Sequence, residues 1–345
     1  MKKYNIAIAG ATGLVGQKIM EILFERNVPI NELKLLASKR SAGKEINFGE
    51  QTLIVEELTK DSFNNVDVAF FSAGGEVSKQ FVPEAVKAGA IVIDNTSMYR
   101  MDEDVPLVVP EVNAHRLKDH KGVIANPNCS TIQLVVALSP IKMAFGLNRV
   151  IVSTYQSISG AGNQAIDIFK EDSIEFMNKG FSVTEEVQKE FLSGKHKTAF
   201  NLVPQIDRFL DNGYTAEEMK MINESKKILE DDQLQLAATC VRVPVLRSHS
   251  ESVYVEIEED DVTLKDFQHI LKQENNIILL DDQEKKLYPT PLLAENKDEV
   301  FIGRMRHDLF NSKGFHLWIV SDNIVKGAAL NTVQILEALM EERLI

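Results

Sequence analysis

Residues 4–16 read YNIAIAGATGLVG, an apolar stretch that runs directly into three closely spaced glycines. The apolar part predicts a buried strand, and residues 13–26 have the apolar spacing of an amphipathic helix. Glycines at such a junction let the backbone approach a pyrophosphate, whose charge is met by N–H groups at the helix N-terminus. The spacing is GxxGxxG instead of GxGxxG, so a plain strand-to-helix turn is the alternative. The residues expected to contact a dinucleotide here are Gly10, Thr12, Gly13, Leu14 and Val15.

Strand and helix patterns alternate through the first 130 residues. Further apolar strands are predicted at 33–37, 66–71, 90–94 and 122–125, with a helix at 76–88. These strands are apolar along their whole length, which is typical of a parallel sheet covered by helices on both faces. The expected fold class is therefore α/β, with an N-terminal doubly wound, Rossmann-type domain that binds a dinucleotide.

The turn after the second strand indicates which dinucleotide is bound. Enzymes that use NAD usually place an acid there to bind the ribose 2′-hydroxyl. This chain instead has Ser38-Lys-Arg40-Ser41, with no acid. Cations and hydroxyls suit a 2′-phosphate, so we expect NADP and contacts from Ser38, Arg40 and Ser41; an ordinary basic surface turn is the alternative. A second small-residue loop, with Ser72 and Gly74, follows the third strand of the predicted sheet.

From about residue 147 the pattern changes. Segments 234–243, 252–258 and 315–321 alternate polar and apolar residues, as half-exposed strands do. We expect an α+β catalytic and dimerisation domain here, followed by a long helix at 324–343 that returns to the first domain. The predicted domains are residues 1–128 with 324–345, and residues 129–323.

Composition excludes several classes of protein. The chain has 345 residues, with 38 Lys and Arg against 51 Asp and Glu, giving a net charge of −13. An acidic balance opposes binding to nucleic acid or anionic membranes. No apolar run approaches the roughly 20 residues of a membrane span, and the N-terminus does not read as a signal peptide, so a cytoplasmic location is expected. Two cysteines are too few for a disulfide framework or a cysteine zinc site, and no metal is expected.

One of the two cysteines has the position of a nucleophile. Cys129 lies in NPNCST at 126–131, directly before a predicted helix at 132–145. The positive end of a helix stabilises a thiolate, although an inert buried thiol is the alternative. A thiolate needs a proton-transfer partner, and His249 lies in a polar, cationic stretch between two predicted strands. Arg100 and Arg242 could bind carboxylate or phosphate, or form surface ion pairs.

Six motifs follow one another along the chain in the same order as in one protein family. They are GATGLVG at 10–16, NPNCST at 126–131, Gln156 with SISGAG at 157–162, EEMK at 217–220, RVPVLRSHSE at 242–251 and KGAALNTVQI at 326–335. In this the chain resembles the bacterial type of aspartate-semialdehyde dehydrogenase. The resemblance implies a homodimer that uses NADP to reduce L-aspartyl 4-phosphate to L-aspartate 4-semialdehyde and releases inorganic phosphate. That step serves lysine, threonine, methionine and diaminopimelate biosynthesis.

The resemblance also implies roles for individual residues. Cys129 would be the acyl-accepting nucleophile and His249 the general acid/base. The implied substrate contacts are Arg242 at the α-carboxylate, Gln156 and Asn128 beside the thiol, and Arg100 with Lys220 at the phosphate, Glu217 holding Lys220. Further cofactor contacts would come from Ser159, Gly160 and Asn323. Val325 stands where many members have Arg, which weakens only a cofactor contact at that position.

Three other functions compete with this one. A reductase of the N-acetylglutamyl-phosphate type would share NADP, thiol and histidine, but the residues that flank its cysteine differ. A catalytically silent dinucleotide-binding protein would have lost the cysteine. A thiol hydrolase without cofactor would not need the glycine loop.

Overall fold

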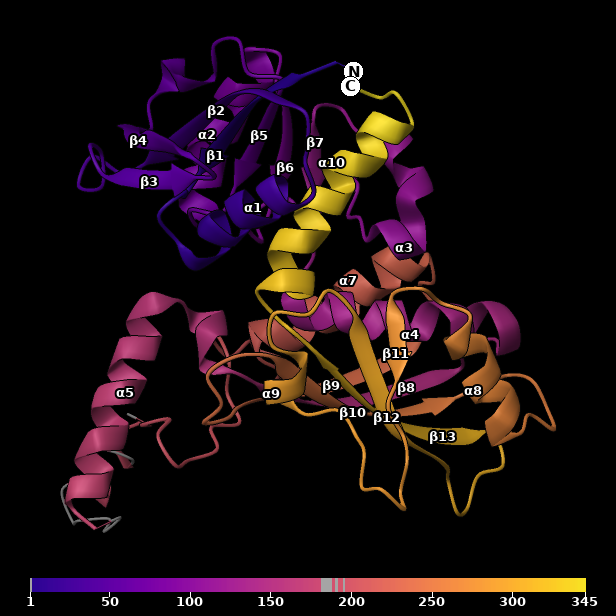
Figure 1. Cartoon of the computed structure of the whole chain (residues 1–345). Helices are drawn as coiled ribbons and strands as arrows, with labels where there is room; N and C mark the ends of the chain where they lie inside the picture. The colour runs from indigo at the N-terminus through magenta and orange to yellow at the C-terminus, as the bar shows by residue number, and fades with distance from the viewer. Residues whose placement is uncertain (1, 181–187, 190–191, 195) are drawn as a thin grey trace. The chain divides into compact units, whose positions relative to one another are not determined.

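The computed structural model describes residues 2–180, 188–189, 192–194 and 196–345 (Figure 1). The chain forms two compact units. The first unit comprises Met1–Ser139, Asn223–Asp232 and Ile324–Ile345, and the second comprises Pro140–Ile222 and Gln233–Asn323. Two of the boundaries fall inside helices α4 (Cys129–Phe145) and α7 (Ala216–Leu229), so each of these helices contributes to both units. The functional division at 128/129 and 323/324 stays a prediction.

The first unit is built on a seven-stranded sheet with the order β3-β4-β2-β1-β5-β6-β7. Its strands are β1 (Tyr4–Ala9), β2 (Ile30–Ala37), β3 (Glu45–Phe48), β4 (Gln51–Glu57), β5 (Val68–Phe71), β6 (Ile91–Asp94) and β7 (Val123–Ala125). Every pairing is parallel except that of β3 with β4. The doubly wound sheet is therefore confirmed. The β3–β4 hairpin was not predicted, because its residues are mostly exposed and lack a continuous apolar run.

Helices cover this sheet and close its core. They are α1 (Leu14–Glu25), α2 (Gly75–Lys87), α3 (Pro110–Asn113), the first part of α4, and α10 (Asn331–Glu341) after a π-helical turn at Val325–Leu330. Ile8 of β1, Leu23 of α1 and Leu336 of α10 belong to one buried cluster. The predicted return of the C-terminal helix is confirmed, although it begins with the π-helical turn and ends at Glu341.

The second unit contains a six-stranded mixed sheet with the order β11-β12-β13-β10-β8-β9. Its strands are β8 (Arg149–Gln156), β9 (Gln235–Arg242), β10 (His249–Glu256), β11 (Ile277–Leu279), β12 (Val300–His307) and β13 (Gly314–Ser321). β8 pairs with β9 in parallel and with β10 antiparallel. The α+β class is confirmed. One placement was wrong: His249 is the first residue of β10, not part of a loop between strands, because its pairing with Ser321 of β13 extends the strand by three residues.

The two faces of this sheet differ. Among its described residues, the helices of the unit are the end of α4, α5 (Asn163–Asn178), the first half of α7, α8 (Leu264–Lys272) and α9 (Pro291–Ala294). On one face Phe267 of α8 stacks on Phe315 of β13 at 4.4 Å between ring centroids. On the other face Tyr155 and Trp318 are half-buried, with their rings 5.4 Å apart. Across the described ranges of both units, no helix combines the length and apolar character needed to cross a membrane.

Candidate active site

The glycine loop has the shape that its sequence predicts. Gly10 follows β1 with φ +94°, and a Cβ on it would lie 2.8–2.9 Å from the backbone and hydroxyl of Ser72. Gly13 is the N-cap of α1 and has no side chain with which to cap the helix. A Cβ on Gly16 would collide with the carbonyl oxygen of Gly10. The loop therefore keeps the helix N-terminus open and close to the strand, which suits a pyrophosphate.

Two neighbouring loops at the carboxyl edge of the same sheet carry the other predicted cofactor residues of this unit. Ser38 and Arg40 are exposed in a tight turn after β2, in which the N–H of Ser41 donates to the carbonyl of Ser38 at 2.8 Å. Ser72 follows β5, and Gly74, with φ +96°, is the N-cap of α2. Thr12, Leu14 and Val15 are half-buried within the glycine loop and the start of α1. The turn after β2 therefore presents the Ser38 hydroxyl and the Arg40 guanidinium and has no acid, whereas Ser41 is buried.

Cys129 is the first residue of α4, three residues earlier than the predicted helix start. The side-chain oxygen of Asn128 accepts the N–H of Ser130 at 2.9 Å and of Thr131 at 3.4 Å, so Asn128 caps the helix. Cys129 is half-buried, whereas Cys240 is fully buried and its pKa is raised by that burial. The positive end of α4 thus acts on the half-buried thiol, and Cys240 is held as an inert thiol.

Arg100 lies in the same unit, close to the start of α4. Its Nε donates to the carbonyl of Asn126 at 2.9 Å, and one terminal nitrogen donates to the carbonyl of Asn95 at 2.7 Å. The other terminal nitrogen is 3.1 Å from Glu224. Because a guanidinium has five N–H groups, each terminal nitrogen keeps one N–H that these bonds do not use. Arg100 is therefore fixed in position and still able to bind an anion.

In the second unit, Arg242 and His249 meet at Ser157. The backbone N–H of Ser157 donates to Nδ1 of His249 at 3.0 Å, and its carbonyl accepts from Arg242 at 2.6 Å. Sheet pairing explains the meeting: β8 ends at Gln156, opposite the last residue of β9, and β10 begins at His249. Gly160 completes the group, since a Cβ there would lie 3.1 Å from Arg242 and 3.3 Å from the His249 ring.

His249 is neutral in this setting. Complete burial, and secondarily the charge of Arg242, lower its pKa to about 3. Its Nδ1 accepts the Ser157 N–H, so the proton of the neutral ring is on Nε2. The ring can therefore donate a hydrogen bond from Nε2.

Lys220, Glu217 and Gln156 form a second polar group in this unit. The Gln156 amide donates to Glu217 at 3.2 Å, and Lys220 contacts Glu217 at 3.2 Å and Asp207 at 2.9 Å. Burial opposes the charge of Lys220, but the two carboxylates together hold its pKa above the usual value. The contact of Glu217 with Lys220, implied by the family resemblance, is present.

Asn323 connects the remaining predicted cofactor residues. Its side-chain oxygen accepts from the hydroxyls of Ser157 and Ser159 at 3.1 and 3.2 Å, and from the N–H of Ser248 at 2.9 Å. Ser159 is buried and Gly160 is exposed. Asn323 therefore fixes the segment that holds His249.

Sequence reasoning missed three residues of these groups: Ser157, Asp207 and Glu224. Ser157 lies inside the 156–162 motif, but its contribution is mainly backbone and leaves no signature. Glu224 follows Glu217 by seven residues in the segment that forms α7, and this spacing was an available signal for a shared helix face. Asp207 has none. Among the described residues, no group of three or more His, Cys, Asp or Glu gathers as metal ligands.

Comparison with known proteins places the chain in a family. Residues 5–120 match the model described as "Semialdehyde dehydrogenase, NAD binding domain", and residues 138–326 match "Semialdehyde dehydrogenase, dimerisation domain". The aspartate-semialdehyde dehydrogenase of Bacillus subtilis is 54% identical over 346 residues, which cover 99% of both proteins. The chain belongs to the aspartate-semialdehyde dehydrogenase family.

Solved structures agree with that membership. The aspartate-semialdehyde dehydrogenase II of Vibrio cholerae, in a structure described as complexed with ASA, has a TM-score of 0.92 at 44% identity, with 99% of both chains covered. The aspartate-semialdehyde dehydrogenase of Candida albicans, in a structure with NADP, has a TM-score of 0.76 at 26% identity, with both chains fully covered. The family's fold therefore extends over both units.

Proposed function

We propose that this chain is the NADP-dependent oxidoreductase that reduces L-aspartyl 4-phosphate to L-aspartate 4-semialdehyde in amino-acid biosynthesis. The observation that carries the proposal is the position of Cys129: first residue of α4, after the Asn128 cap and in the same unit as the fixed guanidinium of Arg100. Family membership supports the substrate, and the lack of an acid in the turn after β2 supports NADP.

The thiolate of Cys129 attacks the acyl carbon of the substrate. A carbon–sulfur bond forms, the bond to the phosphate oxygen breaks, and inorganic phosphate leaves with that electron pair, so that a thioester remains on Cys129. Arg100 and Lys220 stabilise the negative charge on the departing phosphate, and Glu217 holds Lys220 in place. The cations act where charge accumulates.

The glycine loop and the 38–41 turn would hold NADPH, which when bound supplies the hydride that reduces the thioester. His249 then donates a hydrogen bond from Nε2 to the oxygen on which negative charge develops. Ser157 keeps the ring in that orientation. Arg242 binds the α-carboxylate with its guanidinium, and Gln156 orients the acyl group. The tetrahedral oxyanion then collapses: the carbonyl re-forms, the carbon–sulfur bond breaks, and its electron pair returns to sulfur, so the aldehyde leaves and the Cys129 thiolate is regenerated without a net proton transfer.

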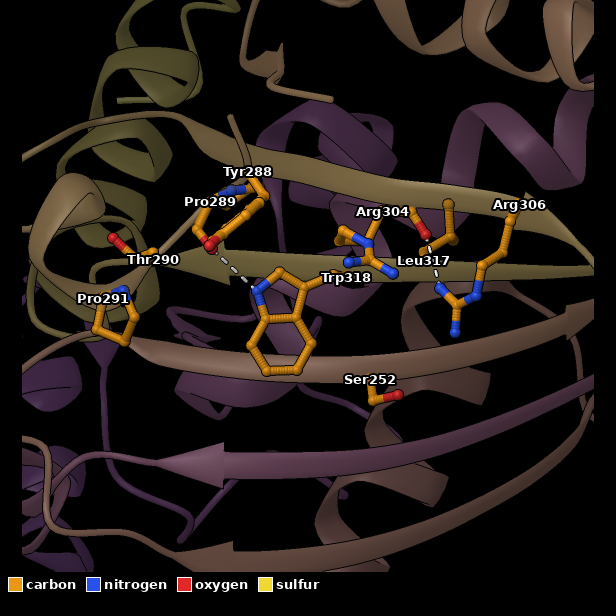
Figure 2. Close-up of a pocket in the computed structure, with 9 residues that line it drawn as sticks. All are labelled: Ser252, Tyr288, Pro289, Thr290, Pro291, Arg304, Arg306, Leu317 and Trp318. Atoms are coloured by element: carbon orange, nitrogen blue, oxygen red, sulfur yellow. Dashed lines mark hydrogen bonds between the residues drawn. The ribbon is translucent and has the colours of Figure 1, made fainter. Parts of the chain in front are cut away.

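We also propose that the chain forms a homodimer through its second unit. The half-exposed face of the mixed sheet carries Tyr155 and Trp318 and is hollowed by a cavity of about 370 Å³. Figure 2 shows the Trp318 indole in this cavity, donating to the Pro289 carbonyl at 3.0 Å, with the Arg304 and Arg306 side chains farther along the sheet. α5 buries none of its residues and so does not complete the core of the unit. A second copy would cover this surface.

Dimer formation is measured by light scattering. A mass near 77 kDa, twice the 38.7 kDa of the chain, is expected at micromolar concentration. A fully active monomer would contradict the proposal.

For location we propose the cytoplasm, consistent with a biosynthetic enzyme that uses NADPH.

The activity is tested in the reverse direction, with aspartate semialdehyde, NADP and inorganic phosphate. Absorbance of NADPH should appear only when all three are present. N-acetylglutamate semialdehyde serves as the matched control substrate, because it would be preferred by the competing reductase. NADPH formation with the control alone would replace the proposal by that alternative, and formation without phosphate would exclude the acyl-phosphate route.

A further inference from the structure

Glu224 is a buried carboxylate that connects the anion-binding arginine to the residue before the nucleophile. It lies in the second half of α7, and its side chain is 1% exposed. One oxygen is 3.1 Å from Arg100, and the other accepts the backbone N–H of Asn128 at 2.7 Å. The proposed reaction does not use it. Its two hydrogen bonds therefore reach the guanidinium of Arg100 and the start of helix α4, the two groups close to the thiol in the sequence and the fold.

The bond to Asn128 acts on the start of α4. Asn128 receives the Glu224 carboxylate at its N–H, while its side-chain oxygen caps the N–H groups of Ser130 and Thr131. The peptide between the β7 loop and Cys129 is therefore held from both sides. A shift of this peptide would move the first turn of the helix and the thiol with it.

The bond to Arg100 is supported by a neighbour on the same helix. Lys227 donates to the backbone carbonyls of Arg100, Asp102 and Val105 at 2.7–2.9 Å. α7 thus holds Arg100 twice, at its guanidinium through Glu224 and at its backbone through Lys227. Arg100 itself donates to the Asn126 carbonyl, three residues before Cys129. Thiol, arginine and carboxylate form one fixed group within the first unit.

Charge gives Glu224 an effect that position alone would not. The positive N-terminal end of α4 and the guanidinium of Arg100 both favour anions, including the thiolate and a phosphate. The carboxylate of Glu224 lies next to the helix end and next to Arg100, and its negative charge reduces their positive potential. We propose that Glu224 is a positioning residue that holds Arg100 and the Asn128 amide beside the thiol, and whose negative charge limits the positive potential there. This limit keeps product phosphate from binding too tightly, a consequence that rests on the proposed function.

Charge is tested with Glu224→Gln, which keeps the size of the side chain and an acceptor oxygen. The pH dependence of Cys129 alkylation by iodoacetamide is followed by peptide mass mapping of the full chain. We expect the midpoint to fall by about one pH unit, because the variant removes a negative charge near the thiol and a nearby charge shifts a pKa by about one unit or more. An unchanged or raised midpoint would overturn the proposal. This measurement needs neither turnover nor cofactor, so its outcome is independent of the proposed function.

Glu218→Gln is the matched control. Glu218 lies on the same helix, is also buried, and also accepts backbone N–H groups, from Thr215 at 2.7 Å and Cys240 at 3.0 Å. It contacts neither Arg100 nor Asn128. Its replacement should lower the melting temperature without moving the alkylation midpoint. Equal midpoint shifts in the two variants would mean that α7 affects the thiol only through stability.

The positioning role of Glu224 is tested with Glu224→Asp, which keeps the charge but is too short to reach both Arg100 and the Asn128 N–H. The same variant is used if the Gln variant does not fold. The alkylation midpoint should stay within a few tenths of a pH unit. The apparent KM for phosphate in the reverse reaction should rise about tenfold, because the contact of Arg100 with the anion is loosened. The apparent KM for the semialdehyde should change less than twofold. A midpoint shift as large as that of the Gln variant, or equal effects on both constants, would contradict the proposal.

Discussion

The two sheets of this protein carry their functional residues in different places. In the parallel sheet the functional groups lie in the segments that follow the strands: the glycine loop after β1, Ser72 after β5, Arg100 beyond β6, and Cys129 at the start of α4 beyond β7. In the mixed sheet they lie at the ends of the strands themselves, with Arg242 last in β9 and His249 first in β10. Parallel strands place all their carboxyl ends on one edge, so chain order alone gathers the loops. In the mixed sheet only strand pairing gathers them.

The largest effect is expected where the parallel sheet presents its thiol. Cys129→Ser should lower kcat by about ten-thousandfold or more, because the hydroxyl is not an anion at neutral pH. NADP binding, measured by fluorescence titration, should persist. Cys240→Ala is the matched control and should keep activity within a few-fold, since Cys240 is buried in β9. Loss of activity in the control with retention in Cys129→Ser would move the nucleophile to the other sheet.

A smaller effect is expected at the strand ends of the mixed sheet. Arg242→Lys keeps the charge but loses the planar fork, and should lower kcat/KM for the semialdehyde about a hundredfold. Arg247→Lys is the control, because Arg247 pairs with the buried Asp322 at 2.9 Å in the same unit. Its kcat/KM should change less than tenfold. If phosphate, not semialdehyde, becomes the weakly bound reactant in Arg242→Lys, the assignment of the carboxylate contact is wrong.

The turn after β2 tests whether exposed loop residues of the parallel sheet also act. Arg40→Ala should raise the KM for NADP about tenfold, because one cation at the 2′-phosphate is lost, and should leave the KM for NAD unchanged. Lys44→Ala removes an exposed cation four residues later and serves as the control. Equal rises for NADP and NAD would exclude a contact of Arg40 with the 2′-phosphate.

The smallest effect concerns the strand-end histidine. The pKa of His249 is about 3 in the folded chain against about 6.5 in an unfolded one, so the unfolded state binds the additional proton between these values. Stability is unaffected by this group above pH 6.5 and falls as the pH drops below it, by about 2 kcal/mol at pH 5. His249→Asn should lose less melting temperature than the wild type between pH 7.5 and 5. Parallel melting curves would show that the ring is protonated in the fold.

Most of the first unit and its site could be predicted from the sequence, and the second much less. Buried parallel strands are continuously apolar, and each is followed by its own polar loop, so Cys129 and the glycine loop were visible. The meeting of Arg242 with His249 depends on the β8–β9 and β8–β10 registers, which leave no local pattern. The residue types of Arg242 and His249 therefore mark both as candidates, but only the family resemblance places them in one reaction.

The peptide group of Ser157 has a consequence for genetics. Its N–H orients His249 and its carbonyl anchors Arg242, so both contacts come from atoms that every amino acid except proline shares. Substituting the side chain leaves those two bonds available, and only the hydroxyl contacts disappear. An alanine scan would therefore rank position 157 as tolerant, although the backbone there organises both partners. Random mutagenesis would reveal its importance through proline, which removes the N–H, and through large side chains, for which the buried position has no room.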